Sequence, residues 1–239
     1  MNRAILILAT LALLLGGVGQ ARAGLLTTAE QTQLETWLGE GPLTLTNIFT
    51  KTAGDGQTSA DFHAAVDGKG RTFTLIEVLP VNGYANQIIG GYDPQSWSSS
   101  GGYNITSSDA DRTAFLFNLT TTTIERQAIG GYQGQYQTYN YSSYGPTFGG
   151  GHDLYVSFDL ASGYAFQYSY GSGYNSTNIL GHTYTYQGLD IGFGAIEVYT
   201  IADAPSAVPE SSSLTLFVMA TATFSGYFGW WRRSRRRRP

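Results

Sequence analysis

Hydrophobic residues occur along most of the chain in short runs, which are bounded by glycine, asparagine, aspartate and proline. Runs of this length, rich in β-branched and aromatic residues, predict strands separated by turns. The predicted strands are residues 73–78, 87–89, 114–119, 123–129, 154–158, 163–170, 183–187 and 195–201. Many short strands with few helices predict a mainly β fold, an antiparallel β-sandwich.

Two segments have helical spacing instead. Thr27 and Glu30 have the spacing of a capping box, and apolar residues follow at helical intervals as far as Leu38. Residues 58–66 predict a second short helix, in which Phe62 and the residue four positions later share a face. We expect both helices to flank the sandwich.

The N-terminus has the pattern of a secretory signal. Arg3 precedes an apolar stretch from Ala4 to Leu15, and Ala21-Arg22-Ala23 is a small-residue cleavage site. Residues 1–23 are therefore predicted to be a signal peptide that is cut before Gly24, with passage through the Sec export machinery. The alternative is an uncleaved N-terminal anchor.

The C-terminus predicts one membrane helix, residues 214–231. Its 18 residues would span about 27 Å, just short of the ~30 Å hydrocarbon core. A linker, residues 202–213, precedes the helix, and an arginine-rich cytoplasmic tail, residues 232–239, follows it.

This order of features resembles the PEP-CTERM sorting signal of bacterial envelope and matrix proteins. The resemblance implies processing by an exosortase-type enzyme and delivery to the cell surface or extracellular matrix. Ser211 stands where the motif has its second proline. The signal residues would be Val208, Pro209, Glu210, Arg232, Arg233, Arg235, Arg236, Arg237 and Arg238.

The two signals leave one domain, residues 24–201, and change the charge of the exported part. Two of the 13 basic residues lie in the signal peptide and six in the tail, so five remain beside 17 acidic residues, a net charge of about −12 for residues 24–213. An acidic domain is repelled by phosphate backbones, so we expect no nucleic-acid partner. The chain has no cysteine, which excludes disulfides and thiol catalysis.

Three segments, in order, resemble the TLD (TLDc) domain family. They are residues 62–76, with the turn Asp67-Gly68-Lys69-Gly70, then residues 90–119, and then residues 143–155, followed by a terminal strand at 196–199. The resemblance implies a β-sandwich of two antiparallel sheets with a few short flanking helices. Eukaryotic members are associated with protection against oxidative damage and with the vacuolar proton pump, but no agreed catalytic machinery accompanies the fold.

The segment Gly149-Gly150-Gly151-His152-Asp153 is the best candidate binding site. Three glycines can bring backbone N–H groups close to a ligand, and Asp153 could bind a cation or accept a sugar hydroxyl. The alternative, which we favour, is that the glycines allow a bulge or a close backbone approach and that Asp153 satisfies buried backbone donors.

Tyrosines are concentrated in one part of the chain. Twelve of 17 lie between Tyr132 and Tyr186, several at i, i+2 spacing, which places two side chains on one face of a strand. Tyr168 and Tyr170 are the pair that we predict to stack on a sugar ring or to contact a protein. The favoured alternative is ordinary strand propensity with half-buried rings.

The remaining polar residues give weaker signals. The only histidines, His63, His152 and His182, lack the close spacing of a zinc site, so no metal or other cofactor is expected. Asp109 starts a segment like an EF-hand loop that lacks the later glycine and glutamate. Glu197 lies in an apolar strand, where a structural hydrogen-bonding role is more plausible than acid catalysis.

These features predict an exported, non-catalytic module that binds or organises a component of the cell envelope or extracellular matrix. The expected partners are an extracellular polysaccharide or an envelope protein. Protection of the envelope against oxidative stress is the alternative function, and a carbohydrate-active enzyme is the weaker alternative.

Overall fold

The computed structural model describes residues 24–172, 177–182 and 190–204. The predicted signal peptide, the predicted strand 183–187, most of the linker and the whole sorting signal lie outside these residues. No helix in the described ranges is long and apolar enough to cross a membrane.

The described chain is mainly β. Its helices are α1 (Thr28–Leu38) and α2 (Ser59–Val66), with 3-10 turns η1 (Asp109–Asp111) and η2 (Gln133–Gln135). The strands are β1 (Leu43–Lys51), β2 (Thr72–Val78), β3 (Gln87–Asp93), β4 (Tyr103–Ile105), β5 (Phe115–Asn118), β6 (Thr123–Arg126), β7 (Tyr136–Tyr139), β8 (Leu154–Val156), β9 (Ser162–Ala165) and β10 (Ile191–Asp203).

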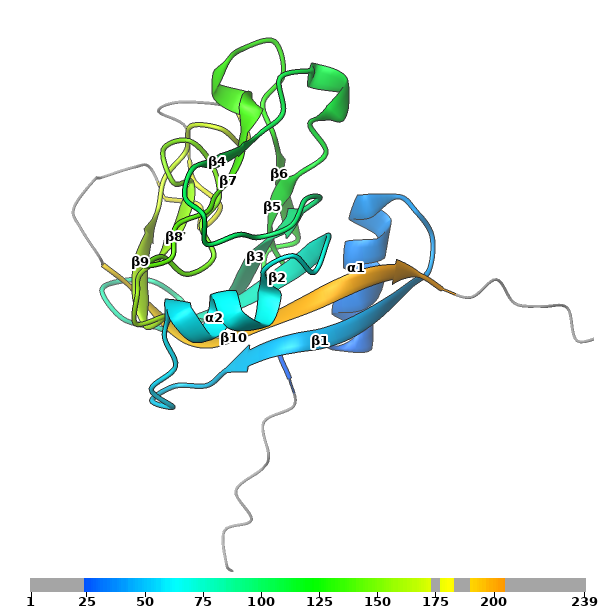
Figure 1. The fold of residues 1–239 in the computed structure, drawn as a ribbon. Coiled ribbons are helices and arrows are strands. Elements are labelled where there is room, and N and C mark those ends of the chain that lie inside the picture. The colour runs from blue at the N-terminus through cyan, green and yellow to red at the C-terminus, as the bar shows by residue number, and fades with distance from the viewer. Residues whose placement is uncertain (1–23, 173–176, 183–189, 205–239) are drawn as a thin grey trace, which may run out of the picture.

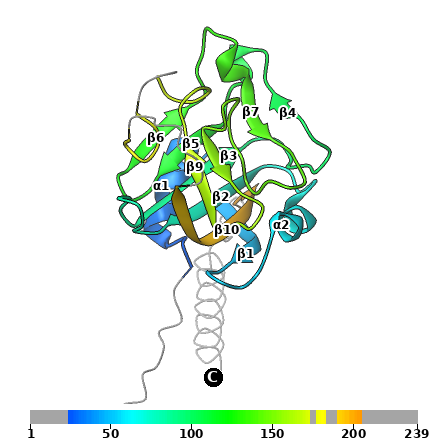
Figure 2. The same ribbon diagram turned by 90° about the vertical axis from the view of Figure 1, so that its left-hand side faces the viewer.

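The strands lie in two layers: β1, β2, β3, β5 and β6 form the first, and β4, β7, β8 and β9 form the second. The long strand β10 connects them (Figures 1 and 2). Its C-terminal part pairs with β1 on one side and with β2 on the other, and the order continues through β3 and β5 to β6. Its first residues pair with β9, which pairs with β8. Every pairing is antiparallel. A bulge between Phe193 and Ile196 marks the change of layer, where the buried Lys51 donates to the freed carbonyls of Phe193 and Gly194.

The second layer is completed by β4 and β7. These strands pair with each other, and isolated bridges of Phe148 to Thr138 and to Leu154 connect β7 to β8. The result is a large curled antiparallel sheet, a small second sheet and two helices. This architecture confirms the predicted mainly β, sandwich-like fold.

Apolar side chains fill both faces of the large sheet. All seven residues of β2 are buried, and they alternate between two cores. Ile76 and Val78 join the core beneath the second layer and α2, whereas Phe73 and Leu75 join the core beneath α1. A strand buried on both faces carries apolar residues on both, so the apolar residues of β2 do not keep to alternate positions.

Both helices have capped N-termini, and the cap of α1 is the predicted one. Thr27 and Glu30 form a reciprocal capping box, and the helix ends at Gly39 in the left-handed conformation. Thr58 and Asp61 form the same kind of box at α2. The core position of Phe62 on α2 presents the next residue, His63, to the edge of the second layer.

Several predicted strand boundaries are corrected: β3 extends to Asp93 rather than to residue 89, β10 spans Ile191–Asp203 rather than 195–201, and β6, β8 and β9 are shorter than predicted. Strand β6 ends at Arg126 rather than at residue 129, and β8 ends at Val156 rather than at 158. The predicted strand 163–170 is only β9, Ser162–Ala165, followed by irregular chain. Its residues 168–170 leave the ladder because their N–H groups bond to the side chain of Asp153 instead.

Candidate functional site

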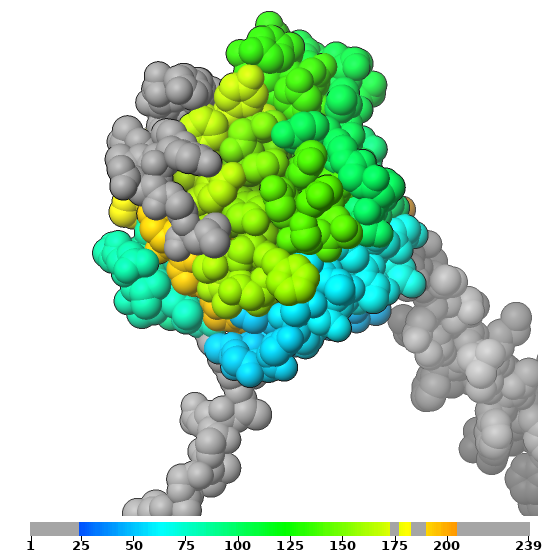
Figure 3. All heavy atoms as spheres, turned by 60° about the vertical axis from the view of Figure 1, so that its left-hand side comes forward, coloured from blue at the N-terminus to red at the C-terminus, as the bar shows by residue number. Residues whose placement is uncertain are grey.

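Tyrosine rings gather on the outer side of the second layer, around His152. We call this surface the tyrosine face; it comprises Tyr103, Tyr136, Tyr139, Tyr141, Tyr144, Tyr155 and Tyr164. These residues come from β4, β7, the loop after β7, β8 and β9. All are partly exposed, and Tyr141 is 44% exposed. The segment that carries most of them is yellow-green and lies across the surface seen in Figure 3.

The rings form one continuous array. Ring centroids are 4.6 Å apart for Tyr103 and Tyr139, 5.2 Å for Tyr141 and Tyr144, and 4.9 Å for Tyr155 and Tyr164. The ring of His152 lies 5.1 Å from Tyr139 and 5.9 Å from Tyr155, and so joins the two halves. These separations are typical of favourable aromatic pairs, so the rings support one another's positions.

His152 is held in the centre by an unusual backbone conformation. Its φ of 57° is left-handed, which is uncommon for a residue with a side chain. Burial lowers the pKa of His152, and its buried Nδ1 has no hydrogen-bond partner among the described residues. The ring is therefore a neutral, mostly aromatic component of the array.

The glycines before His152 permit close packing. A Cβ at Gly149 would lie 1.9 Å from Oδ1 of Asp153, one at Gly150 would lie 2.6 Å from the ring of Tyr136, and one at Gly151 would lie 2.4 Å from the ring of Phe166. Any side chain at these positions would displace a ring or the carboxylate. The backbone N–H groups of Gly149 and Gly150 donate to Gln137 O and Ser169 Oγ. The three glycines thus serve the close backbone approach that we favoured.

Asp153 is fully buried and has a structural contact for each oxygen. Its carboxylate accepts from the backbone N–H groups of Tyr168, Ser169 and Tyr170, at 2.7 to 3.1 Å. Burial raises the pKa of Asp153 to about 7, although these three donors favour the ionised form. Its side chain points away from the tyrosine face, so the adjacent His152 and Asp153 do not act on one ligand.

Tyr168 and Tyr170 are separated by the structure. Tyr170 is completely buried, and its hydroxyl donates to Gln137 O at 2.6 Å. Tyr168 remains partly exposed, stacks on Phe166 and donates to the hydroxyl of the exposed Tyr132 at 3.3 Å, a bond that raises the pKa of Tyr168 to about 12. Of this pair, only Tyr168 can contact a ligand beside the tyrosine face. Contrary to the prediction, Tyr168 and Tyr170 do not share one face, because residues 168–170 are not in a strand.

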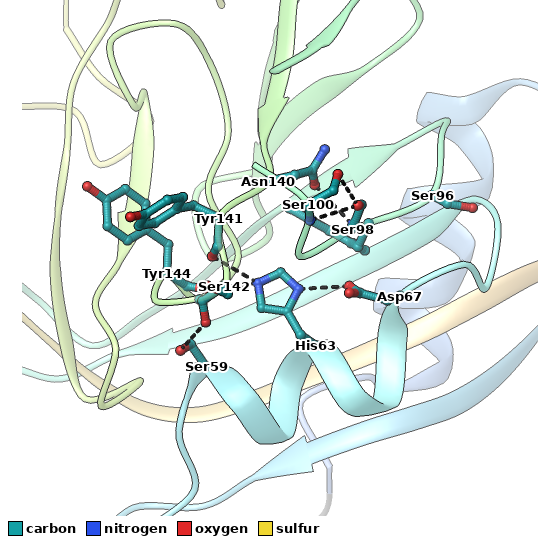
Figure 4. A network of polar contacts seen from close by, with 12 residues as sticks. Ser59, His63, Asp67, Ser96, Ser98, Ser100, Asn140, Tyr141, Ser142 and Tyr144 are labelled. Carbon is teal, nitrogen blue, oxygen red and sulfur yellow. Dashed lines mark hydrogen bonds and ion pairs between the residues drawn. The ribbon is translucent and has the colours of Figure 1, made fainter. Parts of the chain in front are cut away.

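A polar network that the sequence analysis did not identify supports the tyrosine face from below (Figure 4). His63 Nδ1 lies 2.7 Å from Oδ1 of Asp67, and Nε2 lies 3.1 Å from the carbonyl oxygens of both Tyr141 and Tyr144. Ser59 Oγ donates to the carbonyl of Ser142 at 2.8 Å. Helix α2 thereby fixes the loop that carries two tyrosines. The i, i+4 spacing of His63 and Asp67, at the end of a predicted helix, was the signal that could have revealed this pair.

This network borders a shallow depression of about 300 Å³, lined by Ala60, His63, Ala64, Asp67, Ser99 and Ser142. The His63–Asp67 pair resembles the base and orienting carboxylate of a catalytic triad. However, Nε2 faces two backbone carbonyls, which accept hydrogen bonds and cannot be activated as nucleophiles. Among the described residues this histidine therefore has a positioning role for the loop.

The other candidate residues have structural contacts. Glu197 is buried and accepts from the Leu25 N–H and from the Tyr199 hydroxyl, as its position in an apolar strand predicted. In the described ranges, no three His, Asp or Glu side chains are close enough to hold a metal ion. Asp109 lies in η1 and pairs with Arg112 at 2.5 Å.

Comparison with known proteins agrees with the fold. The family model of the TLDc domain matches residues 20–202, which include every described helix and strand except the last residue of β10. No curated protein sequence matches the chain. Because the family model covers more than half of the sequence, this chain belongs to the TLDc domain family.

Proposed function

We propose that the chain is an exported, surface-sorted TLDc module that binds a polysaccharide of the cell envelope or extracellular matrix without chemically changing it. The observation that carries the proposal is the tyrosine face. Seven rings and His152 form one partly exposed array on a single side of the molecule. The export and sorting of the module are proposed from the sequences of its two ends.

The chemistry of the tyrosine face suits a neutral or weakly polar ligand. Each tyrosine offers an apolar ring edge or face and a hydroxyl, a combination that contacts the C–H groups and the hydroxyls of sugars. Burial raises the pKa of Tyr103 and of Tyr155, so their hydroxyls stay protonated, and that of Tyr155 can donate a hydrogen bond to a ligand. The acidic balance of the exported part disfavours strongly anionic ligands.

The tyrosine face is also preorganised. Tyr103 donates to the carbonyl of Gly150 at 3.0 Å, and the loop of Tyr141 and Tyr144 is held by His63. A surface whose side chains are fixed before binding loses less conformational entropy when a ligand docks. This favours a binding role for the array over a role in packing alone, since Tyr141 packs against other rings yet stays 44% exposed.

The direct test measures binding of the full chain to the producing cell's own extracellular polysaccharide by titration calorimetry. We expect saturable binding, weakened about tenfold by Tyr141→Ala and by Tyr155→Ala, because an aromatic contact contributes roughly 1 kcal/mol or more. The matched control is Phe158→Ala. Phe158 is 52% exposed, and within the described residues it makes none of the ring contacts that join the tyrosine face.

Binding that is equally strong in Tyr141→Ala and Tyr155→Ala would contradict this use of the tyrosine face. If the polysaccharide does not bind at all, survival of a deletion strain in peroxide becomes the relevant measurement. Greater sensitivity than the parent strain would support the alternative, envelope protection against oxidative stress.

A further inference from the structure

Gly24, the first residue after the predicted signal cleavage, lies directly against a buried carboxylate. A Cβ built on Gly24 would be 2.9 Å from Oε1 and 3.3 Å from Oε2 of Glu197. The next residue, Leu25, donates its N–H to Oε2 at 3.0 Å. Standard geometry puts the nitrogen of Gly24 about 2.5 Å from that Cβ, and so within roughly 5.5 Å of Oε1.

Glu197 lacks a cation in the described structure. The carboxylate is 6% exposed and lies at the centre of the large sheet, between Thr50 of β1 and Leu75 of β2. Its two hydrogen bonds from described residues, from Leu25 and from the Tyr199 hydroxyl at 2.6 Å, both go to Oε2. None of the ion pairs among described residues includes Glu197. A buried carboxylate without an opposite charge is costly, so a nearby positive group would stabilise it.

We infer that Glu197 is the receptor for the new amino terminus of the mature protein. Cleavage between Ala23 and Gly24 converts an uncharged amide nitrogen into an ammonium group, within reach of Oε1. The hydrolysis adds one water, so that Ala23 leaves as a carboxylate and Gly24 gains the charge. The resulting ion pair fastens the start of the chain to β10. The inference rests on the export step of the proposed function and not on the identity of its ligand.

The geometry leaves little room at position 24. A Cβ there would meet Oε1 at 2.9 Å, so the carboxylate would have to shift to admit a side chain. The geometry also gives removal of the signal peptide a structural consequence: in the uncleaved chain the Gly24 nitrogen is an uncharged amide, so this ion pair forms only after processing.

The test uses the full chain, exported by a host cell and extracted with its C-terminus intact. Mass spectrometry of the N-terminal peptide should identify Gly24 as the first residue, and a different first residue would overturn the inference. The rate of acylation of this amine by an N-hydroxysuccinimide ester is then compared with that of Lys69 in the same molecule. We expect the amine of Gly24 to react about tenfold more slowly in the wild type than in Glu197→Gln.

Two further variants separate the ion pair from general packing. Tyr199→Phe removes one hydrogen bond to Glu197 but leaves the carboxylate charged, so the Gly24 amine should still be acylated slowly. Insertion of one alanine before Gly24 moves the ammonium group away from Glu197. The amine of the inserted alanine should therefore be acylated about tenfold faster than the native Gly24 amine. This comparison tests the ion pair even if Glu197→Gln does not fold. Equal reactivity of the native and extended amines would overturn the inference.

Discussion

At the scale of single residues, Asp93 has an environment poorly suited to a charge. It is fully buried at the end of β3; Oδ1 accepts from the N–H of Gln95 at 3.0 Å, whereas Oδ2 has no partner among the described residues. Burial accordingly raises the pKa of Asp93 to about 7. The protonated form is the better fit, because an uncharged carboxyl loses less by leaving water.

This pKa gives a pH dependence of stability. Because the folded pKa lies above the unfolded value of about 3.9, the folded state binds more protons between these values, and the free energy of unfolding falls as pH rises from about 4 to 7. In Asp93→Asn this decrease in the free energy of unfolding should be smaller by about 2 to 4 kcal/mol. Urea unfolding of both proteins at pH 4.5 and at pH 8 measures the decrease.

The matched control for Asp93 is Asp111→Asn, in an exposed aspartate of η1. This variant should retain the pH dependence of the wild type. A residual slope is expected in Asp93→Asn, because burial also raises the pKa of Asp153 and of Glu125, to about 7 and about 8. If the free energy of unfolding of Asp93→Asn depended on pH as strongly as that of the wild type, Asp93 would not be the source of this dependence.

At the scale of elements, β3 determines how closely the two layers approach. A Cβ at Gly91 would lie 2.5 Å from the ring of Phe148, the residue that bridges β7 and β8. The same strand carries Gly90, whose Cβ would lie 1.8 Å from the carbonyl oxygen of Thr74 on β2. The two adjacent glycines therefore let the large sheet contact the second layer on one face and curl on the other.

Gly91→Ala should consequently lower the free energy of unfolding by about 1 to 3 kcal/mol, the usual cost of an overpacked core. Gly131→Ala is a suitable control, because its Cβ would meet only the end of the flexible Gln133 side chain, at 2.9 Å. Thermal and urea unfolding of both variants provide the comparison. Equal stability of the two would show that the layers can move apart at no cost.

Element prediction succeeded where the local pattern was sufficient. The capping box of α1, the helical spacing of α2 and the apolar residues of β2 and β5 are read directly from neighbouring residues. The strands β4 and β7 were missed because they are short and contain a bulge. Strand β1 was missed although Leu43, Leu45, Phe49 and the polar residues between them partly alternate.

At the scale of the whole molecule, the sequence predicts that location depends on the C-terminal segment. Removal of residues 214–239 should release the module into the medium, since the predicted membrane helix and arginine tail would be lost. Immunoblots of cell and medium fractions measure the distribution. A chain shortened only by residues 232–239 keeps the apolar run and should stay with the cells. Retention of the longer truncation would contradict the predicted anchor.

The sequence by itself determined the mainly β class, both helices, the family and the structural role of Glu197, because caps, apolar runs and motifs are local features. The tertiary structure alone decided which tyrosines meet. Tyr103, Tyr139, Tyr155 and Tyr164 belong to four different strands and are brought around His152 by the pairing of the second layer. It also buried Tyr170 and coupled His63 to the loop of Tyr141. Contacts of this kind depend on strand register and on the approach of the two layers, which no local pattern encodes.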